Sequence, residues 1–494
     1  MTQEKTVDVL IVGGGSAGAV LAARLSEDPA QRVTLVEAGP VYPPDGYPPS
    51  VSSSNVLGGA TGHDWGTISE PGVVGHPVAL YRGKVLGGGS AINGAIAVRA
   101  TQADFARWNI AGWSFDDVLP AFKTLENADG GSDQWHGRSG PLPVHQLDRT
   151  ELSTMQRAFV DAALATGIPA ADDFNGPKPA GVGPYPMNIV DGVRVNTGMA
   201  YLTESVRSRP NLTILGDQLV DRVLTEGGRA VGVLLAGGTQ LRAAEVVLSA
   251  GAIGTPAILL RSGIGPAAHL SALGIDVVAD LPVGQTLYDH PFYHNVYAAK
   301  PDVIGEPTPV LGAKVWTASS EAVGDELDLH IVASHVGDQS VSPTGAAFLL
   351  SIGLVRPVSC GTLTLTSTDP HIDPRVDLNL LAESTDSRRM AEGITLARHI
   401  AATSPLADLI DHELNPGSMD VDASIKSTVN SYHHYSSTTP IGTVVDPLGA
   451  VFGVEGLRVV DASIFPDVPS AAIHLTVLMA AEHIAAELAP RRIK

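Results

Sequence analysis

The chain begins with an apolar strand pattern that runs into a glycine-rich turn. Residues 7–12 form a short run of mainly β-branched and aliphatic side chains, and an alanine-rich helix is expected from Ser16 to Leu25. A second apolar run, residues 32–36, follows that helix and is typical of a strand buried in a parallel sheet. The pattern therefore predicts one βαβ unit at the N-terminus.

Two later segments repeat the pattern of a buried strand. Residues 245–250 form an apolar run that meets Gly251 and continues into an apolar helix. Residues 456–461 form another strand that ends in an acid, and a helix over residues 475–488 follows. Because such strands recur at three distant places, we expect one Rossmann-like α/β domain that is assembled from separated pieces of chain.

The intervening segments have a different character. Residues 327–331 and 362–366 alternate strictly between apolar and polar side chains, as antiparallel strands with one covered face do. A length of 494 residues also favours two or three domains. We therefore predict a second, α+β domain with an antiparallel sheet, at 151–195 and 300–435, beside an α/β domain at 1–150, 196–299 and 436–494.

The glycine-rich turn after the first strand has the spacing of a dinucleotide-binding fingerprint. Gly13 permits a tight turn, Gly15 lets the backbone approach a pyrophosphate, and Gly18 lets the helix and strand pack closely. The phosphates then meet the N-terminus of the helix. Glu37 closes the second strand, where its carboxylate can accept hydrogen bonds from ribose hydroxyls.

The composition of the chain restricts the kinds of molecule that it is expected to bind. The formal net charge of −21 argues against nucleic acid and anionic membranes, and favours a small neutral or cationic partner. Cys360 is the single cysteine, which excludes an internal disulfide framework and fits a cytoplasmic protein. We expect no membrane-spanning helix, because no stretch approaches about 18 uninterrupted apolar residues. We also expect no metal site, because His330, His371, Asp373 and Asp377 lack the spacing of metal ligands.

Four further segments resemble signatures of the glucose-methanol-choline (GMC) oxidoreductases, flavoproteins that oxidise alcohols. They are residues 82–94 (Arg-Gly-Lys-Val-Leu-Gly-Gly-Gly-Ser-Ala-Ile-Asn-Gly), 251–266, 281–291 and 459–463 (Val-Val-Asp-Ala-Ser). The resemblance implies FAD as the dinucleotide, a glutathione-reductase type FAD-binding domain, an alcohol substrate, and oxygen or another electron acceptor. Some members bind the flavin covalently through a histidine whose position corresponds to Ile92, so noncovalent FAD is expected.

The resemblance also implies which residues contact FAD. The ADP half would be held around Gly13, Gly15 and Glu37, with the backbone of Val220 at the adenine. Asp461 and Ala462 would lie near the pyrophosphate and the isoalloxazine. The residues expected along the flavin are Arg82, Gly88, Asn93, Gly94, Ala95 and Ile96. The remaining predicted contacts are Ser16, Ala17, Gly18, Ala38, Ala250, His474 and Leu475.

Alcohol oxidation requires a group that removes the hydroxyl proton, and histidine suits that task near neutral pH. Alignment of Gly442 with a glycine of the family loop places His434 at the catalytic position, with His433 as the alternative if the loop is displaced by one residue. His474 corresponds to the second active-site position. The sequence departs from the family pattern over residues 435–439 and at Val477. His290 is expected to be a structural partner of Asp289.

These features predict an enzyme that oxidises a small, uncharged alcohol to an aldehyde or ketone. His434 would accept the hydroxyl proton, His474 would bind the developing alkoxide, and hydride would pass to flavin N5. Three alternatives remain: a redox-silent lyase or decarboxylase on the same scaffold, an NAD dehydrogenase, and an FAD-bound structural or sensor protein without turnover. The sequence leaves the substrate, the acceptor and the oligomeric state open.

Overall fold

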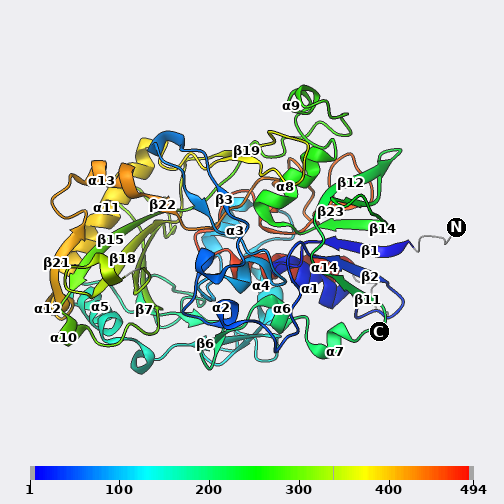
Figure 1. Ribbon diagram of the computed structural model, residues 1–494. Coiled ribbons are helices and arrows are strands. Elements are labelled where there is room, and N and C mark those ends of the chain that lie inside the picture. The colour runs from blue at the N-terminus through cyan, green and yellow to red at the C-terminus, as the bar shows by residue number, and fades with distance from the viewer. Residues whose placement is uncertain (1–5, 338, 489–494) are drawn as a thin grey trace.

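Two β-sheets lie at opposite ends of the molecule, with helices between and outside them (Figure 1). This computed structural model describes residues 6–337 and 339–488. Residues 1–5 and 489–494, which the sequence assigned to the α/β domain, lie outside the described part. No helix within the described part is both long enough and apolar enough to cross a membrane.

The first sheet is built on parallel strands from three distant parts of the chain, as the repeated strand pattern predicted. Its parallel order is β11 (Leu212–Leu215), β2 (Val33–Val36), β1 (Val7–Val12), β14 (Gln240–Leu248) and β23 (Leu457–Val459). The first half of β14 also pairs with an antiparallel extension formed by β13 (Arg229–Leu235) and β12 (Val220–Glu226). Helices α1 (Ser16–Leu25) and α14 (His474–Leu488) pack against each other beside this sheet.

The parallel strands form because their side chains are buried on both faces of the sheet. Leu10, Ile11, Leu35 and Leu248 are fully buried in one apolar cluster that also includes the inner side chains of α1 and α14. Each such side chain contributes about 1.5–3 kcal/mol to the stability of the folded chain. Burial of the strands fixes the position of the glycine-rich turn at the carboxyl end of β1, where dinucleotides bind in sheets of this kind.

The second sheet is antiparallel. Its order is β21 (Ile410–Asn415), β15 (Pro291–Ala299), β18 (Ala347–Leu354), β17 (Leu329–Ser334), β16 (Leu311–Thr317) and β7 (Gly181–Pro184), with β22 (Asn430–Ser431) beside β15. After β7, which lies within the first predicted segment of 151–195, the sheet continues from Pro291 and not from residue 300. The alternating segment at residues 362–366 does not join it: β19 (Thr362–Thr364) pairs with β20 (Arg375–Asp377), and Leu363 belongs to the core of the parallel sheet.

Both faces of the antiparallel sheet are covered. Helices α5 (Thr154–Ala165) and α11 (Ser384–Ala401) pack on one face, where Ile331 and Ile352 are buried. The sequence predicted one covered face, yet every residue of β17 is buried. On the opposite face, His330 and Ser334 line an internal cavity and are not exposed to solvent.

Candidate active site

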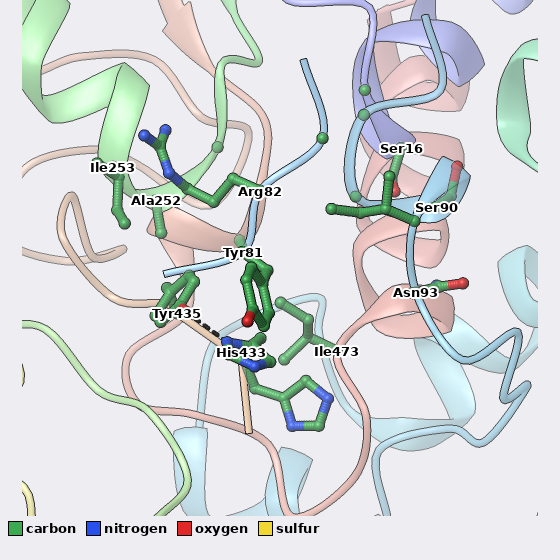
Figure 2. A pocket seen from close by; sticks show the side chains of 18 of the residues that line it. Ser16, Tyr81, Arg82, Ser90, Asn93, Ala252, Ile253, His433, Tyr435 and Ile473 are labelled. Atoms are coloured by element: carbon green, nitrogen blue, oxygen red, sulfur yellow. Dashed lines mark hydrogen bonds between the residues drawn. The ribbon is translucent and has the colours of Figure 1, made fainter. Parts of the chain in front are cut away.

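A cavity of about 750 Å³ extends between the parallel sheet and the antiparallel sheet. Figure 2 shows Ser16, Ser90 and Asn93 on one side of it, across from Arg82, Tyr81 and His433. The predicted cofactor contacts that line the cavity are Gly13, Gly15, Ser16, Ala17, Glu37, Ala38, Arg82, Gly88, Asn93, Gly94, Ile96, Val220, Ala250, Asp461, Ala462 and His474. His433 and His434 line it as well. Residues that are far apart in the sequence thus surround one space.

Three predicted contacts do not line the cavity. Gly18 lies within α1, where a Cβ atom would sit 1.9 Å from the carbonyl oxygen of Gly13, so this glycine serves the close packing of helix and turn. Ala95 is fully buried and belongs to the apolar cluster of the antiparallel sheet. Leu475 is fully buried in the core of the parallel sheet. Ala95 and Leu475 therefore lie behind the cavity wall in this structure, and their contact with FAD stays a prediction.

The glycine-rich turn after β1 leaves room for a pyrophosphate to approach the protein backbone. Gly13 has a φ of +97°, and a Cβ atom there would lie 2.5 Å from the carbonyl oxygen of Ser249. A Cβ on Gly88 would lie 2.7 Å from the Cα of Gly15, so these two backbones approach each other at the cavity wall. The N-terminus of α1 faces the same space, and its free N–H groups favour a phosphate.

Glu37 lies at the end of β2, where the sequence predicted a ribose-binding acid. Its two carboxylate oxygens accept hydrogen bonds from the backbone N–H groups of Gly14 and Gly39, each at 2.8 Å. Burial raises the pKa of Glu37 to about 7. The carboxylate is therefore held rigidly at the cavity wall, and its oxygens can still accept hydroxyl hydrogen bonds.

Several polar atoms of the cavity wall lack partners. The Arg82 Nε, Ser249 Oγ and His474 Nε2 atoms are buried and make no hydrogen bond within the described part of the chain. Buried polar groups are normally hydrogen-bonded, so such a group of unpaired atoms indicates a site for a polar ligand. Within the described residues, no cluster of three His, Cys, Asp or Glu side chains is arranged to hold a metal ion.

His434, at the cavity wall, pairs with His290, which is fully buried behind it. Its Nδ1 atom lies 2.9 Å from Nδ1 of His290, and the two rings meet edge to face. The backbone N–H groups of His434 and His290 both donate to Oδ1 of Asp289, at 2.7 Å and 2.8 Å. Asp289 therefore contacts His290 through the backbone, whereas the imidazole of His290 contacts His434. This pairing was not predicted from the sequence, although the Asp289-His290-Pro291 segment lies within one of the family signatures.

The environment of His434 keeps its ring neutral. Burial, together with the neighbouring rings of His290 and His433, holds the pKa of His434 well below its ordinary value. Burial also lowers the pKa of His290, to about 3. The Nε2 atom of His434 has no hydrogen-bond partner among the described residues. A neutral imidazole with one free nitrogen at a cavity wall has the properties of a general base.

His433, the alternative base, is engaged in a different set of contacts. Its Nδ1 atom lies 2.8 Å from the hydroxyl of Tyr435, and its ring lies 4.8 Å from that of Tyr81 (Figure 2). The residue has a φ of +65°, and burial lowers its pKa to about 4. His433 therefore borders the cavity on its Tyr81 side.

His474 lies next to the fingerprint turn. It begins α14, and its Nδ1 atom lies 3.2 Å from Oγ of Ser16 at the start of α1. No hydrogen bond or ring contact within the described part of the chain joins His474 to His434. The two predicted catalytic histidines thus contact different groups: His434 contacts His290, and His474 contacts the glycine-rich turn.

Comparison with known proteins identifies the family. Residues 7–292 match the N-terminal family model described as GMC oxidoreductase, and residues 357–481 match the C-terminal one. The chain belongs to the GMC oxidoreductase family. A 5-(hydroxymethyl)furfural oxidase from Methylovorus is 35% identical, with 97% of this chain and 98% of the relative covered. An oxygen-dependent choline dehydrogenase from Burkholderia lata is 34% identical, with 98% and 94% covered.

A solved GMC-type structure confirms the fold. Pyridoxine 4-oxidase from Mesorbium loti superimposes with a TM-score of 0.90 at 32% identity, over 98% of this chain and 99% of that chain. The predicted fold class, an α/β FAD-binding domain with a substrate domain built on an antiparallel sheet, is confirmed. So is FAD as the cofactor of this GMC oxidoreductase. The cavity fits FAD, since its wall combines the glycine cradle, Glu37 and the unpaired polar atoms.

Proposed function

We propose that this GMC oxidoreductase oxidises the CH–OH group of a small-molecule alcohol to an aldehyde or ketone, with His434 as the general base. The single observation that carries the proposal is the neutral, cavity-lining His434 ring, held at Nδ1 by His290 and unpaired at Nε2. The names of the relatives support the substrate class, because 5-(hydroxymethyl)furfural, choline and pyridoxine all carry alcohol groups.

The contact between the two histidines determines which nitrogen of His434 is the base. One of the two facing Nδ1 atoms must donate to the other, and Nε2 of His290 has no hydrogen-bond partner in the described part of the chain. We assign the donated proton to Nδ1 of His434, so that His290 accepts at its own Nδ1. The lone pair of His434 then lies on Nε2, where it can accept the hydroxyl proton of an alcohol.

The other residues of the site orient the base or bind the cofactor. The Asp289 carboxylate holds the backbones of His290 and His434 at a fixed separation, so the base needs no rearrangement before proton transfer. We assign His474 to cofactor binding and not to the alkoxide, because its contact is with Ser16 of the fingerprint turn. FAD, when bound, supplies the hydride acceptor, and oxygen or another electron acceptor reoxidises it.

The proposal is tested by anaerobic stopped-flow mixing of the holoenzyme with a panel of primary and secondary alcohols. We expect bleaching of the flavin absorbance, which a lyase or decarboxylase would not produce. In the His434→Ala variant, reduction should slow by roughly 10²- to 10⁴-fold with FAD still bound. His145→Ala is a matched control, because this histidine is exposed and bonds Asp129 and Glu151. Normal flavin reduction by His434→Ala would refute the assignment of the base.

A further inference from the structure

A lysine is buried in the cavity wall without an acidic partner. Lys314, on β16, is only 1% exposed and lines the cavity that holds His434. No carboxylate within the described part of the chain forms an ion pair with it. Its Nζ atom lies 3.7 Å from the centre of the Trp316 ring and 4.6 Å from that of Phe174. Lysine is rarely buried without a counter-ion, because removal of an ammonium group from water is costly.

The hydrogen-bonding capacity of Lys314 is also largely unused. Its Nζ atom approaches one acceptor, Nε2 of His330 on β17, at 3.4 Å. When Lys314 is protonated it only donates, so His330 then accepts at Nε2 and carries its own proton on Nδ1. That Nδ1 atom is buried and has no partner among the described residues. Lys314 and His330 together therefore present unpaired N–H donors at the cavity wall.

The strand register explains why these donors face the cavity. Lys314 pairs with Val332, Val332 with Ser351, and Ser351 with His294, so one row of side chains crosses four strands on the same face of the sheet. All four residues of this row line the cavity. The opposite face carries the apolar side chains that pack against α5 and α11. Lys314 is thus on the substrate side of the sheet and not in the core beneath it.

Two ring contacts connect the neighbour of Lys314 to the proposed base. The ring of His330 lies 6.3 Å from that of Tyr432, and the ring of Tyr432 lies 4.5 Å from that of His434. Lys314 and His434 both line the same cavity. A molecule in this cavity that carries a hydroxyl at one end and an acceptor at the other can therefore contact both groups.

We propose that Lys314 and His330 form a subsite for a carboxylate on the substrate, so that the enzyme oxidises alcohols that also carry a carboxylate. This inference rests on the proposed alcohol oxidation and names its substrate class. A carboxylate supplies the counter-ion that Lys314 lacks and accepts the unpaired N–H groups. Burial without a counter-ion lowers the pKa of Lys314 well below its ordinary value, and a bound carboxylate would favour the charged form. We therefore expect an anionic alcohol and not the uncharged alcohol that was expected from the sequence.

The test compares alcohols of one shape on the intact holoenzyme. Anaerobic flavin reduction is measured with 4-(hydroxymethyl)benzoate, with its methyl ester and with benzyl alcohol. We expect half-saturation by the carboxylate at a concentration about tenfold or more below that of the ester. Lys314→Met, which replaces the amine with an unbranched apolar side chain one atom shorter, should remove this preference. Lys426→Met is the matched control, because Lys426 is exposed on α13 (Val421–Thr428), and it should keep the preference.

A second measurement tests the carboxylate subsite independently of alcohol oxidation. Benzoate, which has no alcohol group, is titrated into the oxidised enzyme while the flavin absorbance spectrum is followed. Benzoate binding by the wild type and at least tenfold weaker binding by Lys314→Met would support the subsite even if no alcohol reduced the flavin. Absence of reduction by any alcohol would count against the proposed function alone. Equal half-saturation by acid and ester in the wild type, or a failure of benzoate to bind it, would overturn the carboxylate subsite.

Discussion

The Nδ1 atoms of His290 and His434 lie 2.9 Å apart, and the backbone N–H groups of both residues donate to one oxygen of Asp289. One buried carboxylate therefore fixes two imidazoles that are 144 positions apart in the sequence. Because both Nδ1 atoms are used in this contact, Nε2 is the nitrogen of His434 that remains for a substrate.

Replacement of His290 should impair the base without removing FAD. His290→Phe keeps a ring of similar size but leaves Nδ1 of His434 without its partner, so flavin reduction should slow by roughly 10- to 100-fold. His290→Gln retains an acceptor oxygen and should restore most of the rate. Anaerobic stopped-flow kinetics and the FAD content of each variant are the measurements. Equal rates for the Phe and Gln variants would show that His290 only fills space.

The rate of flavin reduction should depend on pH only in the acid range. The base must be neutral, and burial with two neighbouring histidines holds the pKa of His434 well below its ordinary value of about 6.5. The rate should therefore stay constant as the pH falls from about 8 to about 6.5, and decline only below that. The measurement is stopped-flow reduction at saturating alcohol with FAD in excess. A decline centred at or above pH 7 would contradict the low pKa.

FAD binding should weaken as the pH falls through neutrality. Burial raises the pKa of Glu37 to about 7, so below this pH the carboxyl group becomes protonated and loses acceptor capacity toward the ribose. Glu37→Gln should bind FAD roughly tenfold more weakly and lose this pH dependence, because its amide nitrogen faces a backbone N–H donor. Titration of the apoprotein, followed by FAD fluorescence at about pH 6 and 8, measures both effects. The same wild-type affinity at both pH values would be inconsistent with a titrating Glu37.

The flavin should be released by acid precipitation. The residue at the position that some family members use for a covalent link is Ile92, whose side chain has no nucleophilic atom and is buried at the cavity wall. The yellow colour should therefore remain in the supernatant after precipitation and centrifugation. Absorbance spectra of supernatant and redissolved pellet check this, and colour in the pellet would point to a covalent link elsewhere in the chain.

Much of the cofactor site could be predicted from the sequence because its determinants are local. The turn from Gly13 to Gly18 needs glycine for its backbone geometry, and the buried strands β1 and β2 are continuous apolar runs. The return of distant strands to one sheet followed from the same apolar pattern. The resemblance named Ala95 and Leu475 as cofactor contacts, but the structure buries both behind the cavity wall, because a motif does not specify which of its side chains point into a cavity.

The surroundings of the alternating strands could not be predicted from the sequence, because alternation of apolar and polar residues does not determine what covers each face of a strand. The sequence predicted one covered face from residues 327–331, but the polar residues of β17 face the cavity and are buried. Residues 362–366 alternate in the same way, yet β19 packs with the core of the parallel sheet. In both cases the neighbour of the strand, and not its own pattern, determined its environment.

The sequence by itself determined the dinucleotide turn, the two kinds of sheet and the family, because short-range backbone geometry and apolar periodicity specify them. Only the tertiary structure decided that His434 pairs with His290 and that Lys314 faces the substrate cavity without a counter-ion. The physical reason is that these properties depend on which strands and loops become neighbours. Hydrogen-bond partners, burial and local charge arise from contacts between separate segments, such as those that carry His290 and His434, 144 positions apart.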